Sequence, residues 1–168
     1  MIAMGPELLG RLVDAHAAAL VLYARQWCSI PEDIVQEAFL KLATQAKPPE
    51  HPVAWLYCVV RNAAISAGRA CQRRLKHESR AAAQTPTWFI PAENAGLDGE
   101  TATAALRDLP VMQREVIVAH IWGGLTFEQI ASLTGTSAST AYRWYVAGLS
   151  VLRERLGAPC PSKPATPR

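Results

Sequence analysis

Several features that mark whole classes of protein are missing from this sequence. No apolar run approaches the roughly 18 residues of a membrane span and there is no charged-then-apolar leader, so we expect a cytoplasmic protein without membrane insertion. The four cysteines are scattered, without a Cys-x-x-Cys pair or a histidine at ligand spacing, and predict neither a metal site nor a disulfide framework. We interpret them as small buried apolar residues in a reducing compartment.

Signatures of catalysis are missing as well. The chain has no carboxylate pair, no Cys/His pair and no glycine-rich phosphate loop, so we expect neither an enzyme nor a bound cofactor. Strand patterns are also lacking, because no stretch sustains an apolar/polar alternation with β-branched residues. Half of the 168 residues are apolar, and the fold class that we predict is therefore all-α.

Charge is scarce but unevenly distributed. The formal net charge of +3 is too small to indicate a nucleic-acid partner by itself. Segment 61–80, however, contains a single acid, Glu78, against the cations Arg61, Arg69, Arg73, Arg74, Lys76 and Arg80. Two interpretations fit this end of a long predicted helix equally well: a phosphate-facing cationic surface, or a solvated helix end whose cations complement the helix dipole.

Residues 126–156 carry the most specific pattern in the chain. Thr126 followed three residues later by Gln129 predicts a capping box, and Gly135 suits the positive φ that ends a short helix. Ser137 can cap a second helix, whose apolar positions recur at near-helical spacing. Two helices joined by a short glycine-containing turn make a helix-turn-helix, with the second helix placed to enter a DNA major groove. Any two amphipathic helices separated by glycine would look similar, and this alternative stays open.

The remaining pattern predicts two small helical domains joined by a flexible linker. Their boundaries are 7–83 for the first domain, 84–100 for the linker, 101–156 for the second domain and 157–168 for a disordered tail. The helices expected before the helix-turn-helix cover 7–27, 30–45, 53–83, 101–109 and 111–122. Ser29 and Glu32 predict another capping box at the start of the second of these helices.

Motifs in both domains, in this order, resemble a known family. The first domain carries Glu32-Asp33-Ile-Val-Gln36-Glu37-Ala-Phe39-Leu-Lys41-Leu42 and then Trp55-Leu56-Tyr57…Arg61-Asn62-Ala63-Ala64-Ile65. The second carries Leu106-Arg-Asp-Leu109-Pro110…Gln113-Arg114-Glu115-Val116 before the helix-turn-helix. Over about residues 8–156 the chain is similar to bacterial sigma factors of the extracytoplasmic-function (ECF) group, the minimal two-domain sigma factors.

This resemblance implies partners and site residues. In that family the first domain binds the clamp helices of RNA polymerase and captures the melted minus-ten promoter element, and the second domain reads the minus-thirty-five element as duplex. By position, the resemblance assigns polymerase contact to Asp33, Gln36, Glu37 and Lys41. Polar residues of this kind would also occur on a helix face that is simply solvated. The resemblance assigns DNA contact to Arg61, Asn62, Arg69, Arg73, Arg74, Ser139, Thr140, Tyr142 and Arg143. Expected partners are core RNA polymerase and promoter DNA, with an anti-sigma factor as the control element.

The chain also departs from the family pattern. Ser66 stands where an aspartate is usual, and Trp144, Val146 and Ala147 stand where basic residues are usual. Each lost phosphate contact weakens nonspecific DNA binding, so we expect weak promoter binding in the absence of polymerase. Two alternative functions stay open: a helix-turn-helix regulator that acts without polymerase, and a diverged protein-interaction module. The sequence identifies neither the promoter, the inducing signal, the anti-sigma factor nor the relative orientation of the domains.

Overall fold

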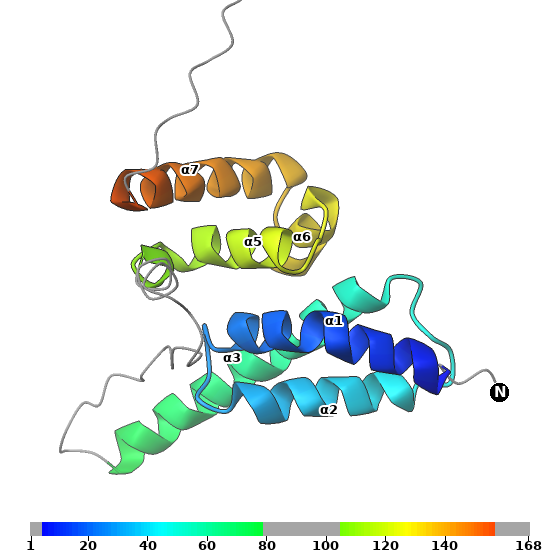
Figure 1. Ribbon diagram of the computed structural model, residues 1–168. Coiled ribbons are helices and arrows are strands. Elements are labelled where there is room, and N and C mark those ends of the chain that lie inside the picture. The colour runs from blue at the N-terminus through cyan, green and yellow to red at the C-terminus, as the bar shows by residue number, and fades with distance from the viewer. Residues whose placement is uncertain (1–4, 79–104, 157–168) are drawn as a thin grey trace, which may run out of the picture.

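The computed structural model describes residues 5–78 and 105–156, and every regular element in these ranges is helical (Figure 1). The helices are α1 (Pro6–Ala24), α2 (Pro31–Ala43), α3 (Pro52–Glu78), α5 (Val111–Ile121), α6 (Phe127–Thr134) and α7 (Ala138–Leu156). The predicted all-α class is confirmed. The predicted linker and tail, 84–100 and 157–168, lie outside the described residues, as does 79–83 at the expected end of the third helix.

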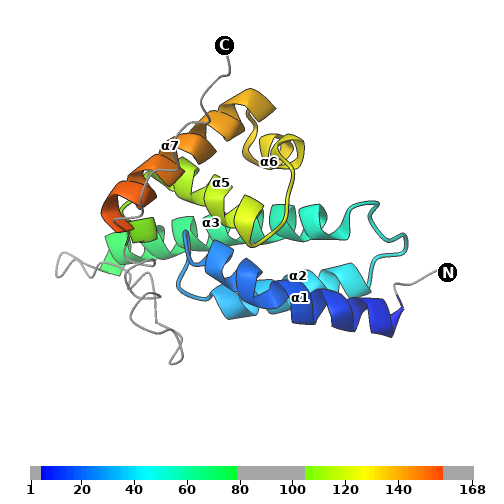
Figure 2. The ribbon, with the colours of Figure 1, turned by 45° about the horizontal axis from the view of Figure 1, so that its top comes forward.

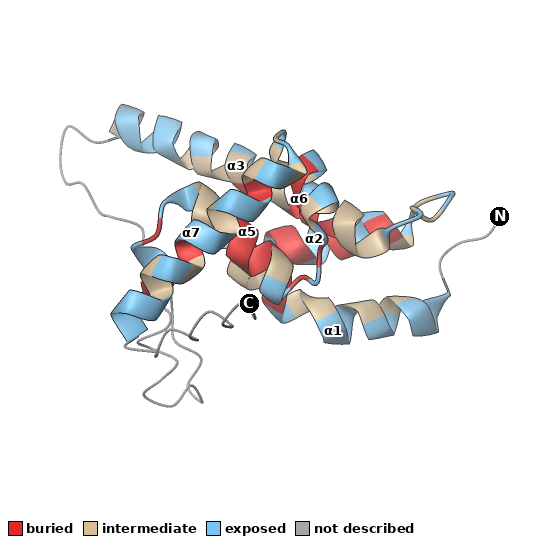
Figure 3. Cartoon of the chain, turned by 90° about the horizontal axis from the view of Figure 1, so that it is seen from above, coloured by how far each residue is buried: buried red, intermediate tan, exposed pale blue. Residues whose placement is uncertain are grey.

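Helices α1, α2 and α3 pack side by side as the first lobe (Figure 2). Each begins with a proline in its first turn, where the missing N–H costs no helical hydrogen bond. On α2 the inward stripe follows helical spacing and comprises Ile34, Val35, Ala38, Phe39 and Leu42. On α3 the last fully buried residue is Ala64, so the following turns run on as a largely exposed rod (Figure 3).

The helix-turn-helix of the second lobe (α5, α6 and α7) forms as predicted. The Gln129 backbone N–H donates to Thr126 Oγ1 at 3.3 Å, and the Thr126 N–H donates to Gln129 Oε1 at 3.0 Å, which completes the capping box. Gly135 follows α6 with φ of 72°, in the left-handed region that favours glycine. The Thr140 N–H donates to Ser137 Oγ at 3.2 Å, so Ser137 caps α7 as expected.

Helix α7 lies across α5 and α6, on the side of the second lobe away from the first lobe (Figure 1). Its buried residues are Ala141 and Gly148. A Cβ atom at Gly148 would lie 2.7 Å from Cδ1 of Ile117 and 3.2 Å from Cβ of Gln113. Glycine at this position therefore allows α7 to cross α5 closely, and a larger residue would push the two helices apart.

The two lobes are packed against each other in this structure. Helix α5 contacts α1, helix α6 contacts α3, and one buried apolar cluster extends from Leu56 of the first lobe to Ile130 of the second. In the turn after α5, a Cβ atom at Gly123 would lie 2.6 Å from Cζ of Tyr57. The absence of a side chain at Gly123 thus lets the aromatic ring of α3 approach the second lobe. In the described part of the chain, the lobes share a continuous core.

Two predictions about the first lobe are wrong. Ser29 does not cap α2, because the N-cap residue is Ile30 and no side chain makes a capping hydrogen bond there. Glu32 instead pairs with Arg25 at 2.6 Å, which directs its carboxylate toward the end of α1. The described cysteines are free thiols but are not buried: Cys58 is exposed, and Cys28 and Cys71 are half-buried. Their interpretation as buried residues therefore fails for Cys58 and holds only in part for Cys28, which packs against the apolar core, while Cys160 lies outside the described residues.

Candidate nucleic-acid and polymerase interface

The outward face of α2 carries the residues predicted to contact polymerase. Asp33, Gln36 and Glu37 lie between the buried positions of the helix and are exposed. Lys41 Nζ lies 2.9 Å from Glu37 Oε1, one turn along, in an exposed pair worth about 0.3–0.5 kcal/mol. Among the described ion pairs none involves Asp33, and Leu40 between these side chains is 60% exposed. This face therefore combines an unpaired carboxylate with exposed apolar surface.

The second half of α3 presents most of the cations predicted to face phosphate. Arg69 and Arg73 are exposed and one helical turn apart, and Arg74 is exposed directly after Arg73, so the three form a stripe along the rod. None of the three takes part in an ion pair within the described residues. Asn62 is exposed closer to the lobe, where its amide makes only a long contact, 3.7 Å, to Cys58 Sγ. These side chains are available to a partner.

Arg61 differs from the other predicted DNA contacts because it faces the second lobe. Its Nε donates to Oε1 of Glu115 at 2.6 Å, and its side chain is 20% exposed. The guanidinium carbon also lies 5.9 Å from the centroid of the Trp27 ring, within the range of a cation–π contact. In this conformation Arg61 is therefore engaged by helix α5 and by Trp27.

Glu115 is an acidic residue with no solvent exposure. The Tyr23 hydroxyl donates to the same Oε1 atom at 2.6 Å, so one carboxylate oxygen accepts hydrogen bonds from both α1 and α3. A buried carboxylate is costly unless it is paired, and both donors come from the first lobe. Burial, and then the proximity of Glu115, raises the pKa of Tyr23 well above its ordinary value, which keeps the hydroxyl protonated. Glu115 thus links α5 to two helices of the other lobe.

A second polar contact supports the same lobe–lobe interface. Arg114 Nε donates to Gln26 Oε1 at 3.2 Å, and its Nη1 donates to the Arg107 carbonyl at 2.9 Å. The sequence predictions assigned no role to Arg114, Glu115 or Tyr23. A usable signal was present in α5, where two charged residues directly precede a run of buried apolar residues beginning at Val116. Charged residues directly beside such a run indicate a specific partner rather than solvent.

The exposed face of α7 gathers the residues predicted to enter a major groove. Ser139, Tyr142 and Arg143 are exposed, whereas Thr140 is half-buried. The Thr140 hydroxyl is shared between Ser137 Oγ at 2.9 Å and a long contact from Arg143 at 3.5 Å. Thr140 is therefore occupied within the helix cap, and the other three side chains are available to bases.

The departures from the family pattern separate into core and surface positions. Trp144 is half-buried and packs against the shared apolar cluster, so it contributes to the fold. Val146 and Ala147 are exposed on the same face of α7 as Arg143. Ser66 is exposed on α3. The changes at Val146 and Ala147 therefore replace expected cations by apolar groups on the predicted DNA-facing surface.

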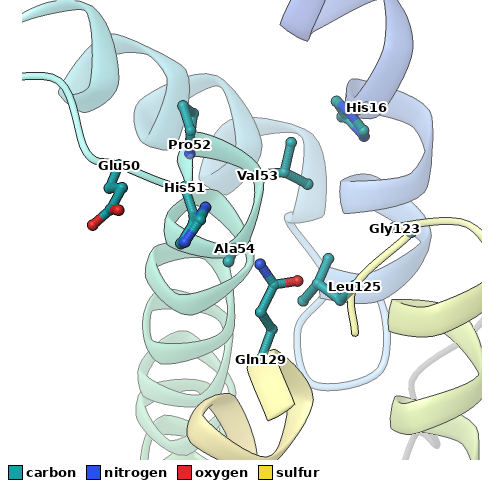
Figure 4. Close-up of a pocket in the computed structure, with 10 residues that line it drawn as sticks. His16, Glu50, His51, Pro52, Val53, Ala54, Gly123, Leu125 and Gln129 are labelled. Carbon is teal, nitrogen blue, oxygen red and sulfur yellow. The ribbon is translucent and has the colours of Figure 1, made fainter. Parts of the chain in front are cut away.

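A shallow groove of about 400 Å³ lies where the start of α3 meets α1 and the second lobe (Figure 4). Its lining residues are His16, Glu50, His51, Pro52, Val53, Ala54, Gly123, Gly124, Leu125 and Gln129. The Gln129 amide belongs to the capping box, and the two histidines come from different segments of the first lobe. Among residues 5–78 and 105–156 there is no cluster of three metal-binding side chains, and no helix long and apolar enough to cross a membrane. The groove marks the junction between the lobes.

Comparison with known families identifies both lobes. The family described as Sigma-70 region 2 matches residues 12–75, and the family described as Sigma-70, region 4 matches residues 100–152. The two matches cover well over half of the chain, and they fall on the helices that carry the surfaces described above. The chain belongs to the ECF sigma factors. For this sigma factor, the family matches do not favour a helix-turn-helix regulator that works without polymerase, or a diverged interaction module.

Two curated relatives agree with this assignment. The ECF RNA polymerase sigma factor EcfG of Rhodopseudomonas palustris (strain TIE-1) is 30% identical over 112 residues, which cover 65% of this chain and 61% of the relative. The RNA polymerase sigma factor CarQ of Myxococcus xanthus is 29% identical over 132 residues, which cover 77% of this chain and 76% of the relative. The chain thus spans less than two thirds of the length of EcfG.

Solved structures share the fold of this sigma factor. The sigma factor RpoE of Bartonella quintana, crystallised with the anti-sigma factor NepR, has a TM-score of 0.70 at 22% identity and covers 93% of this chain and 100% of its own. CnrH, solved with the cytosolic domain of CnrY, has a TM-score of 0.57 at 20% identity and covers 94% of this chain and 92% of its own. At these identities the likeness concerns the fold alone.

Proposed function

We propose that this sigma factor binds core RNA polymerase and directs it to promoters, acting in the cytoplasm without catalysing a reaction itself. The observation that carries the proposal is the order of the region 2 and region 4 matches, each lying on a lobe whose predicted binding surface is exposed. We assign polymerase and minus-ten binding to a domain of residues 7–83. We assign minus-thirty-five binding to a domain of residues 101–156.

The polymerase contact is assigned to the outward face of α2. Asp33, Gln36, Glu37 and Lys41 project from one rigid helix, and exposed carboxylates suit a basic partner surface. The exposed Leu40 adds apolar area at the centre of this face. Because the charges are solvated, we expect them to contribute mainly to the association rate and to specificity.

The minus-ten contact is assigned to α3. The stripe of Arg69, Arg73 and Arg74 neutralises phosphates along the single strand, while the Asn62 amide can hydrogen-bond to the edge of a base turned out of the stack. Binding only the melted form shifts the duplex toward strand separation by differential affinity. Arg61 joins this surface once it is released from Glu115.

The minus-thirty-five contact is assigned to the exposed early face of α7. Arg143 is suited to a bidentate hydrogen bond with guanine in the major groove, and Ser139 to a shorter polar contact. Thr140 acts mainly through the helix cap that positions these side chains.

Simultaneous reading of both elements requires the lobes to separate. Two elements about 25 base pairs apart lie roughly 85 Å apart along B-form DNA, at about 3.4 Å per base pair. In the present structure α5 and α6 contact α1 and α3 directly. We therefore propose that the packed arrangement is a free form, which opens on polymerase and promoter.

An anti-sigma factor is the control element that we propose for this chain. RpoE of Bartonella quintana, which shares its fold, was crystallised with such a factor. A protein that holds the lobes together or covers α2 would prevent the polymerase contact proposed above.

The test of the proposed function is transcription in vitro with core polymerase, the full chain and a genomic DNA library. We expect new start sites that appear only when the chain is added, preceded by shared sequences at minus ten and minus thirty-five. Core polymerase alone is the background control. If the chain is folded and its addition does not change the set of start sites, the proposal is overturned.

A further inference from the structure

The exposed face of α7 is unusually apolar for a surface that meets DNA. Between residues 139 and 150 of this helix, six positions share this face and are exposed: Ser139, Tyr142, Arg143, Val146, Ala147 and Ser150. Arg143 is the single charged residue among them. Phosphate attraction from this part of the face is correspondingly weak, so its contribution to promoter choice must come from hydrogen bonds and apolar contacts with base edges.

Two large apolar side chains form one edge of this face. Tyr142 is 55% exposed and Val146 is 46% exposed, and a spacing of four residues places them one above the other on the helix. The Tyr142 ring is held edge-on against Phe127 of α6, with ring centroids 5.3 Å apart and planes at 87°. Contact with α6 fixes the direction of the ring, and Val146 has few rotamers of its own. The edge is therefore both apolar and well ordered.

The apolar feature of a major groove is the C5-methyl group of thymine, which side-chain carbon atoms contact in direct readout. We propose that Tyr142 and Val146 read thymine methyl groups in the minus-thirty-five element, an inference that rests on the proposed function. Four residues of helix rise by about 6 Å, and base pairs by about 3.4 Å each, so the two methyl groups belong to base pairs one or two steps apart. Arg143, beside them, adds the guanine contact.

This arrangement gives a function to Val146, which stands where the family usually has a basic residue. A valine at position 146 cannot neutralise phosphate, but it can bury a methyl group that a charged side chain would leave hydrated. The same face lies away from the first lobe, so it is accessible in the packed arrangement as well as after opening (Figure 1).

Templates that contain deoxyuridine test this inference directly. After start-site mapping with core polymerase and the full chain, one promoter is rebuilt with deoxyuridine replacing each minus-thirty-five thymidine in turn. Deoxyuridine keeps the base pair and removes only the methyl group. In competition with the unmodified template, we expect initiation to fall about fourfold at one position for each side chain, as burial of one methyl group predicts.

Variants of the two residues assign the positions. In the Val146→Ala variant, we expect that replacing one particular thymidine by deoxyuridine no longer lowers initiation. In the Tyr142→Ala variant we expect the same at a different thymidine, while deoxyuridine at the other positions still lowers initiation. Val146→Thr keeps the shape of the side chain but adds a hydroxyl. It should weaken the effect of deoxyuridine at the same position as Val146→Ala does. Val111→Ala is the matched control, because Val111 is 44% exposed on α5, and it should keep both responses.

The outcomes separate this inference from the proposed function. Mapped promoters that initiate equally well with deoxyuridine at every position would overturn the inference and leave the proposed function standing. If the variants initiate less on every template alike, and the unaltered chain initiates equally with and without deoxyuridine, then Tyr142 and Val146 do not act through thymine methyl groups, and the inference is also overturned. If no start site depends on the chain, the proposed function and this inference fail together.

Discussion

Arg61 and Glu115 are 54 positions apart in the sequence, and Nε of the first donates to Oε1 of the second at 2.6 Å. A guanidinium bound to a buried carboxylate cannot neutralise a phosphate at the same time. The lobe–lobe contact and a promoter contact through Arg61 are therefore alternatives, and any partner that favours one state weakens the other by the same free energy.

Glu115→Gln should release Arg61 to DNA. The amide keeps an acceptor oxygen but loses the charge. This weakens its contact with Arg61 by about 1–2 kcal/mol, which is a factor of about 5–30 in the equilibrium constant of that contact. We expect the full-length variant, without polymerase, to bind a single-stranded minus-ten oligonucleotide more tightly by up to that factor. Fluorescence anisotropy measures the affinity, and energy transfer between labels on the two lobes measures their separation.

Glu154→Gln is the charge-matched control for this variant, because Glu154 is exposed on α7 and should leave both measurements unchanged. Adding Arg61→Ala to Glu115→Gln should remove the gain in affinity. If the double variant binds as tightly as Glu115→Gln, Arg61 does not contact the strand.

Two neighbouring tyrosines give opposite predictions for loss of a hydroxyl. Tyr23 and Tyr57 are both fully buried, with ring centroids 4.8 Å apart. The Tyr23 hydroxyl donates to Glu115, whereas the Tyr57 hydroxyl is buried without a hydrogen-bond partner in the described part of the chain. Tyr23→Phe should lower the free energy of unfolding in urea by about 1.5–3 kcal/mol, and Tyr57→Phe should leave it unchanged or raise it. Equal losses in the two variants would contradict this assignment.

Alkaline pH should destabilise the chain through the same residues. Burial is the main cause of the raised pKa of both tyrosines, so the native state holds these protons after an unfolded chain has released them. Their contribution to stability is complete below about pH 10, the ordinary tyrosine pKa, and falls above it by up to about 1.4 kcal/mol per pH unit for each tyrosine. Urea unfolding between about pH 9 and pH 11 should show a shallower decline for Tyr23→Phe than for the unaltered chain. Parallel curves would contradict the prediction.

Asp33→Asn should weaken binding to core polymerase. Asp33 is exposed and makes no ion pair among the described residues, so its charge is available to a basic surface. Loss of one solvated charge contact is worth about 0.5–1 kcal/mol, or about two- to fivefold in affinity, and its effect should shrink at high salt. Titration of labelled polymerase at two salt concentrations measures both quantities.

Glu32→Gln controls for the charge change at Asp33, since Glu32 is already paired with Arg25 within the chain. We expect it to bind polymerase like the unaltered chain. An equal loss for both variants would indicate a general effect of charge and would remove the specific role proposed for Asp33.

Local signals in the sequence predicted the helix-turn-helix well. Thr126, Gln129, Gly135 and Ser137 act within a few residues of their partners, and the capping box, the left-handed turn and the second cap all form as expected. The expectation for Ser29 failed because Ile30 is the N-cap of α2, and because Arg25, from the end of α1, pairs with the Glu32 carboxylate that the capping box needed. Local patterns hold only where no tertiary partner competes.

The lobe–lobe contact could not be predicted in the same way. Tyr23, Arg61 and Glu115 come from three separate helices, and no spacing rule connects them. The sequence therefore predicted Arg61 as an exposed DNA contact, whereas the structure places it against a buried acid that local patterns could not pair. The face of α7 was also only partly predicted, because burial alone separates Trp144, half-buried against the core, from Val146, on the surface.

The glycine at the crossing of α5 and α7 limits how this protein can change its targets. Even a Cβ atom at Gly148 would lie 2.7 Å from Cδ1 of Ile117, so this close crossing holds α7 in the rotation that points the same six side chains outward. If this face reads promoters as proposed, new promoter preferences arise by substitution at those positions, one base contact at a time, and not by re-aiming the helix.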